Sequence, residues 1–173
     1  MMFPFDIAKA SDVASEFLQR EGGTMNILKL VKLVYLLDRL SIDRRGIPVV
    51  GGAYFSLPNG PITSELLDLI NAGRLCGSDD SSWEERIGDR QNHEVALQST
   101  VSSEHLSSSE IDLLDEIYRE HGAKGQWELV EWTHRNCPEW TSLLQGRDLI
   151  PVERIAEAVG KSDPEVQRVR EEA

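Results

Sequence analysis

The sequence predicts a mainly α fold, in which a compact helical domain surrounds a buried central helix and carries a small antiparallel β-hairpin. Three observations lead to this prediction. Apolar residues recur at helical spacing along most of the chain. The stretch 27–40 is apolar nearly all round, which is typical of a buried helix. Sequence that favours β-strands is confined to two short stretches, 49–57 and 94–98.

Length and composition are those of one globular domain over residues 1–173, with a tail expected to fray from about residue 161. A chain of 173 residues can bury roughly two-thirds of its unfolded surface. Hydrophobic residues make up 40% and charged residues 28%, as in ordinary folded proteins. Thirty acidic against eighteen basic residues give a net charge of -12, which repels phosphate backbones. We therefore expect no nucleic-acid partner.

The chain has the features of a cytoplasmic protein that does not bind membranes. The N-terminal residues lack the basic and apolar regions of a signal peptide. The longest apolar stretch is interrupted by Lys29 and Lys32 and is too short to span a bilayer. Cys76 and Cys137, the two cysteines, form no C-x-x-C pair, in keeping with a reducing compartment.

The first half of the chain should contain two helices in succession. Residues 6–20 place apolar side chains on one face, and the glycines at 22–23 end the helix. Either Thr24 or Asn26 can cap the next helix, which should run to about Arg45. This second helix is the predicted centre of the domain.

Three basic residues form a stripe on that otherwise apolar helix. At 100° per residue, Lys29, Lys32 and Arg39 fall within about 80° of one another. Two interpretations remain open. The side chains can extend outward and pair with acidic residues on neighbouring helices, or they can form a contact site for an acidic partner.

A short β segment should follow the central helix. Residues 49–57 favour a strand and end in the turn-forming residues 58–61, after which Pro61 is suited to the first position of a helix. Residues 73–92 are rich in Gly, Ser, Asp and Arg and are interpreted as a loop. The strand predicted at 94–98 is expected to pair with 54–57.

The second half begins with a capping box. Ser107 and Glu110 have the spacing of that motif and predict a helix that ends near Gly122. A further helix is expected over 126–135. It must end by Asn136 or Cys137, because Pro138 disfavours a helical conformation in the residue before it. Its apolar residues, including Trp127 and Val130, should face inward. Helix starts are expected at Pro151 and Pro164.

No catalytic or metal centre is evident, so we expect a protein that is not an enzyme and has no cofactor. His134 and Cys137 supply half of a zinc site, and no second pair matches their spacing. Cys137 lacks the sequence signature of a cysteine nucleophile. A more ordinary role for His134 and Arg135 is in the last helical turn, where cationic or donor groups interact favourably with the free backbone carbonyls. Trp140 should then pack back on that helix.

Three blocks of residues resemble the Panacea domain, also called the SocA-like antitoxin domain. They are a Lys- and Leu-rich helix, a Gly-Pro turn and a late Thr-His, Pro and Trp pattern. The matching residues are Lys29, Leu30, Lys32, Leu33, Tyr35, Gly60, Pro61, Thr133, His134, Pro138 and Trp140. Two departures stand out: Ile62 replaces the usual Val, and Glu139 separates Pro138 from Trp140, which are adjacent in the family pattern.

The resemblance implies an antitoxin of a prokaryotic toxin-antitoxin system, a family also found in phages. It implies direct binding of a cognate toxin or, alternatively, delivery of that toxin to a ClpXP-type protease. The motif residues are turn formers and large packing residues and should be mostly structural. Candidate partner contacts are Lys29, Lys32 and Arg39 on the central helix, or the segment 73–92. An interaction module without an antitoxin role and a small enzyme are the other classes considered.

Overall fold

The computed structural model describes residues 2–100 and 103–173. Helices account for 52% of the described residues, and the strands form small antiparallel sheets, so the predicted mainly α class is confirmed. The helices are α1 (Ile7–Arg20), α2 (Ile27–Arg45), α3 (Ser64–Ala72), α4 (Ser82–Arg86), α5 (Ser108–His121), α6 (Gln126–Asn136), α7 (Val152–Ala158) and α8 (Asp163–Glu172). The strands are β1 (Thr24–Asn26), β2 (Tyr54–Leu57), β3 (Gly60–Thr63), β4 (Glu94–Ala96) and β5 (Asp148–Ile150).

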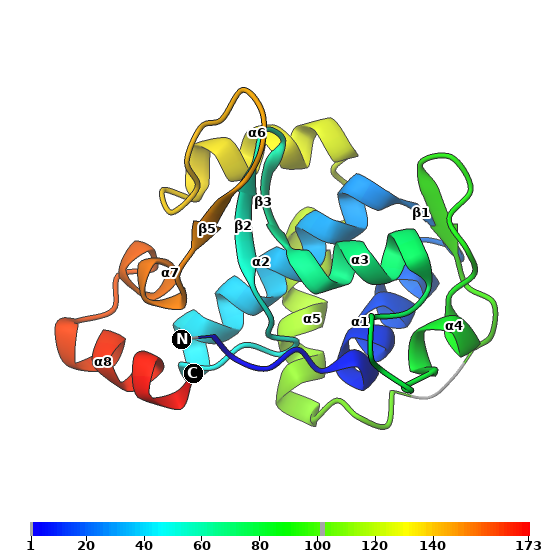
Figure 1. Ribbon diagram of the computed structural model, residues 1–173, viewed down its shortest axis with the longest axis horizontal. Helices are drawn as coiled ribbons and strands as arrows, with labels where there is room; N and C mark the ends of the chain where they lie inside the picture. The colour runs from blue at the N-terminus through cyan, green and yellow to red at the C-terminus, as the bar shows by residue number, and fades with distance from the viewer. Residues whose placement is uncertain (1, 101–102) are drawn as a thin grey trace.

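Helix α2 is the buried centre of the fold, as predicted. It packs against α1, α3, α5, α6 and α7 and against strands β1 and β3 (Figure 1). Of the two candidate caps, Asn26 performs the role: its side chain accepts hydrogen bonds from the backbone N–H groups of Leu28 and Lys29. Gly46 ends the helix with a φ of 78°, a left-handed conformation that glycine adopts without strain.

The strands pair differently from the prediction. Strand β4 pairs with β1, with Val95 opposite Met25, and not with residues 54–57. The physical reason is that both edges of β2 are already occupied, by β3 on one side and by β5 on the other. Strand β2 instead forms an antiparallel hairpin with β3, with Leu57 opposite Gly60, and this pairing was not predicted.

Pro61 lies inside strand β3 and not at the first position of a helix, so that prediction was wrong. It faces Ser56 across the hairpin, and α3 begins only at Ser64. Strand β3 lies at an edge of its sheet, so a residue without an N–H group breaks no ladder on the outer side.

The segment 73–92 is packed and contains helix α4, which the composition did not indicate. Trp83 of α4 is only 2% exposed. Arg86 forms an ion pair with the buried carboxylate of Asp12 on α1. The ion pair joins α4 to α1, and the two helices pack against each other.

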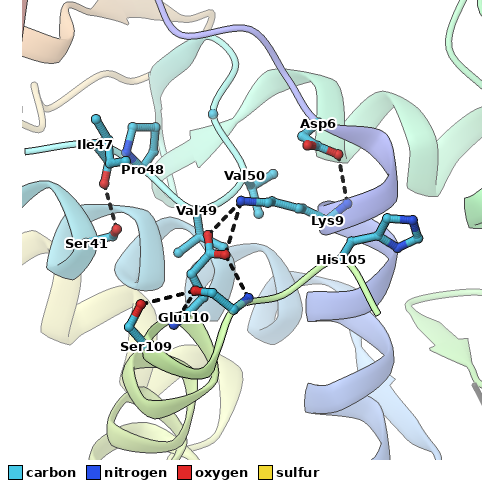
Figure 2. A network of polar contacts seen from close by, with 12 residues as sticks. Asp6, Lys9, Ser41, Ile47, Pro48, Val49, Val50, His105, Ser109 and Glu110 are labelled. Atoms are coloured by element: carbon cyan, nitrogen blue, oxygen red, sulfur yellow. Dashed lines mark hydrogen bonds and ion pairs between the residues drawn. The ribbon is translucent and has the colours of Figure 1, made fainter. Parts of the chain in front are cut away.

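The predicted capping box of α5 is confirmed, and its carboxylate also joins three helices. Glu110 accepts a hydrogen bond from the Ser107 N–H at 3.0 Å. It also pairs with Lys9 of α1 at 2.9 Å (Figure 2). Arg45 at the end of α2 lies 3.5 Å from the same carboxylate. Burial opposes the charge of Glu110, but the contacts with Ser107 and Lys9 hold its pKa below the ordinary value.

The C-terminal elements begin at prolines, as expected. Pro151 caps α7, and Pro164 lies in the first turn of α8. Helix α8 packs on α7 and buries Val166 and Val169. Along the described chain, no helix combines the length and the apolar character that crossing a bilayer requires.

Candidate partner-binding site

The separate motif blocks meet in one place, where α2, the β2–β3 hairpin and the end of α6 come together. Lys32 of α2 donates from Nζ to the Pro61 carbonyl oxygen at 3.0 Å. A Cβ atom placed on Gly60 would lie 2.7 Å from Thr133 Oγ1 and 3.0 Å from Lys32 Cε. Gly60 therefore lies where the three segments approach most closely, and we call this junction the clasp.

The late motif closes the clasp from the other side. Trp140 donates from Nε1 to the Leu57 carbonyl oxygen at 2.8 Å. The His134 ring stacks on the Trp140 ring with centroids 3.8 Å apart and planes inclined by 9°. This stacking confirms that Trp140 packs back on α6. Burial, followed by the charge of Lys32, lowers the pKa of His134, which favours the neutral ring.

Glu139, the residue that departs from the family pattern, is a buried part of the clasp. Its side chain is 1% exposed and accepts hydrogen bonds from Tyr35 Oη at 2.8 Å and from Arg39 Nε at 2.7 Å. The additional residue thus places a carboxylate against two side chains that lie one turn apart on α2. Sequence reasoning missed this role, because Tyr35 and Arg39 lie about 100 positions earlier in the chain.

The basic stripe on α2 faces the protein interior. Lys29 pairs with Glu21 at 2.6 Å and donates to the Gly122 carbonyl oxygen at 2.7 Å. Lys32 has no exposed surface, and the Arg39 side chain is 16% exposed. Pairing with acidic residues is therefore correct for Lys29 and Arg39, but the pairs are internal. The alternative of a surface contact stripe is wrong for Lys29 and Lys32, because both side chains are buried between α2 and its neighbours and donate hydrogen bonds there.

Next to the clasp lies an apolar groove of about 570 Å³. Its wall combines the first turns of α2, the β2–β3 turn, one residue of α3, the loop before β4 and the start of α6. The lining residues are Asn26, Ile27, Leu28, Val31, Lys32, Leu57, Pro58, Asn59, Ile62, Leu67, Arg90, His93, Gln126 and Trp127. We call this feature the α2–α6 groove.

Trp127 borders the groove and is 61% exposed. The prediction that it faces inward was wrong, because the buried face of α6 is formed by Leu129, Val130 and Thr133. Val130 is buried as predicted. An exposed indole beside an apolar hollow is unusual for a surface that contacts only water.

The lining of the α2–α6 groove contains basic residues and no acidic residue. This is notable in a chain with 30 acidic residues. The larger hollow of about 630 Å³ beside the N-terminal segment includes Asp6, Asp80 and Glu172. The groove is thus both apolar and free of negative charge, unlike the surface expected from the composition.

Cys137 is unsuited to nucleophilic chemistry in this fold. Its thiol is 1% exposed, and burial raises its pKa to about 12. The reactive thiolate is therefore strongly disfavoured at neutral pH. In the part of the chain that the structure describes, no three His, Cys, Asp or Glu side chains are grouped as a metal ion would require.

The fold and the clasp define a class of protein, a mainly helical domain in which the motif residues join a hairpin to the central helix. The family model described as "Antitoxin SocA-like, Panacea domain" matches residues 30–141. The chain belongs to this family, and membership implies a protein partner in general. The matched range holds the motif residues other than Lys29. No curated protein and no solved structure matched the chain.

Gly60→Ala should lower the free energy of unfolding by about 2–4 kcal/mol. The φ of +107° at Gly60 disfavours any side chain, and the new Cβ would press on Thr133 and Lys32. Urea denaturation measures the change. Gly23→Ala is the matched control, because Gly23 has a φ of +106° with nothing within 4 Å of its Cβ position. Equal losses in the two variants would contradict the close packing of the clasp.

Lys32 should make stability depend on pH. Burial lowers its pKa from 10.5 to about 7 in the folded state. Between these values the unfolded chain binds more protons, so stability rises with pH by up to about 1.4 kcal/mol per unit. We expect urea unfolding from pH 7 to pH 9 to show a steeper rise for the wild type than for Lys32→Met. Parallel curves for the two proteins would show that Lys32 keeps its ordinary pKa.

Proposed function

We propose that this protein is an antitoxin that neutralises a cognate toxin by direct, stoichiometric protein–protein binding. The observation that carries the proposal is the family match over residues 30–141, which contains the hairpin turn, the late motif and the α2 motif except Lys29. On this proposal the protein acts in the cytoplasm as one half of a toxin-antitoxin pair.

The proposal assigns binding, and not catalysis, to this chain. The buried, protonated Cys137 supports it, because that thiol cannot serve as a nucleophile at neutral pH. The internal use of Lys29, Lys32 and Arg39 supports it as well, since these groups hold the fold together. The motif residues then have a structural task, and the partner is recognised by the surface around them.

The experiment is a binding measurement with the product of the neighbouring gene in the source genome. That protein is purified as an inactive variant, mixed with the present chain and analysed by calorimetry and light scattering. Direct neutralisation predicts a stable complex of defined stoichiometry from the two proteins alone. If no complex forms and the toxin disappears only when a ClpXP-type protease is added, delivery to the protease replaces sequestration.

A further inference from the structure

We propose that the α2–α6 groove docks a segment of the toxin in which a large apolar side chain lies next to an acidic residue. This inference rests on the proposed antitoxin function and assigns the surface and the chemistry of recognition. The apolar side chain would enter the hollow beside Trp127, and the carboxylate would face Arg90 and His93 at the rim.

The apolar half of the argument comes from the lining of the groove. Val31 and Ile62 are buried, and Leu28, Leu57 and Leu67 are partly exposed. A volume of about 570 Å³ is ample for one large side chain and its flanking backbone. Removing such surfaces from water is the main favourable contribution to association.

Trp127 has the position of an interface anchor. It is 61% exposed at the start of α6, next to the hollow. Tryptophan is among the residues that most often dominate binding energy, because a large rigid ring is buried at a small cost in entropy. A second apolar surface is needed to cover both the indole and the hollow.

Charge complementarity selects the acidic neighbour. Arg90 is exposed, and its hydrogen-bond partners are neutral: the Asn71 side-chain oxygen and the Asn92 carbonyl oxygen, the latter at 2.8 Å. His93 is exposed at the same rim. Because no acidic residue lines the groove, the positive charge of Arg90 is available to a carboxylate from outside.

The same charge argument disfavours a basic segment as the occupant of the groove. Basic segments are attracted instead to the acidic surface elsewhere on the protein. A chain with a net charge of -12 draws cationic partners over most of its surface. The α2–α6 groove is a local exception and therefore adds specificity to a general attraction. A partner with an overall basic surface and one acidic, apolar segment fits both features.

The test uses two groove variants with matched controls. Trp127→Ala removes the anchor, and Leu144→Ala removes a fully exposed apolar side chain that does not line the groove. Arg90→Glu reverses the rim charge, and Arg135→Glu reverses an exposed charge at the other end of α6. All four positions are exposed, so the variants should fold, which circular dichroism and urea denaturation verify.

Calorimetry with the inactive toxin is expected to show at least about tenfold weaker binding for Trp127→Ala and for Arg90→Glu. The two controls should bind like the wild type. An acidic residue of the toxin that faces Arg90 should be found by scanning, and its replacement by Arg should restore binding to Arg90→Glu. Wild-type affinity in both groove variants would overturn the docking site and leave the antitoxin proposal standing.

Two other results would overturn the proposed function or the docking site separately. If the wild-type protein binds no neighbouring gene product and rescues no toxicity, the proposed function fails before the groove is tested. If light scattering shows a dimer of this chain that Trp127→Ala dissociates, a second copy covers the groove and the docking proposal is wrong.

Discussion

Glu139→Ala is expected to lower the free energy of unfolding by about 3–5 kcal/mol. The carboxylate is 1% exposed and accepts from Tyr35 Oη and Arg39 Nε. Truncation leaves a largely buried guanidinium without its counter-charge and the Tyr35 hydroxyl without its acceptor, which is far costlier than losing an exposed ion pair. Urea denaturation at neutral pH measures the loss.

The matched control is Glu131→Ala, which removes the exposed pair between Glu131 and Arg135 on α6. That change should cost less than about 1 kcal/mol, because both side chains are well solvated. Equal effects of Glu131→Ala and Glu139→Ala would mean that Glu139 does not join the late motif to α2.

Asp38→Ala should have an effect of similar size, about 3–5 kcal/mol, for a different reason. The buried Asp38 carboxylate accepts hydrogen bonds from the N–H groups of Val49, Val50 and Gly51, and from Tyr54 Oη at 2.8 Å. Each donor left unpaired in the interior costs about 1–3 kcal/mol, with part regained through local rearrangement.

Asp38→Asn distinguishes the contribution of the Asp38 charge to stability from that of its hydrogen bonds. Burial raises the pKa of Asp38 to about 6 even though four hydrogen bonds oppose that shift, so the charge itself is expensive in this site. An asparagine retains one acceptor oxygen without the charge and should fall between the wild type and Asp38→Ala in urea denaturation. A loss below about 1 kcal/mol for Asp38→Ala would show that the loop 49–51 does not depend on this carboxylate.

The elements that could be predicted are those whose signals are local. Asn26, the Ser107 and Glu110 pair and Gly46 act within one helical turn of the ends they define, and the structure uses each of them. The burial of α2 also follows from its own composition, because a helix that is apolar nearly all round has no stable exposed position.

Strand pairing and the environment of single side chains depend on tertiary contacts. The stretches 24–26 and 94–96 are only three residues long, so neither contains enough pattern to identify its partner. Trp83 and Trp127 are the same residue type on short helical segments, yet one is 2% and the other 61% exposed. The difference comes from tertiary packing, because α4 packs against α1, whereas Trp127 lies outside the buried face of α6.

The clasp was predictable as a set of residues but not as a geometry. Lys32, Gly60 and Trp140 belong to the motif blocks, and nothing in their spacing indicated that all three meet. Glu139 looked like a disturbance of the late motif, because its partners Tyr35 and Arg39 lie about 100 positions earlier in the chain. The α2–α6 groove was unpredictable for the same reason, since its wall combines five segments.

The most direct test of the central claim is a toxicity rescue in a host that lacks ClpXP-type proteases. The neighbouring gene of the source genome is expressed under tight control, with and without this protein, and surviving cells are counted. We predict growth arrest that co-expression of the wild-type protein relieves, because direct binding needs no protease. Arrest that persists despite full expression of this protein would contradict neutralisation by direct binding.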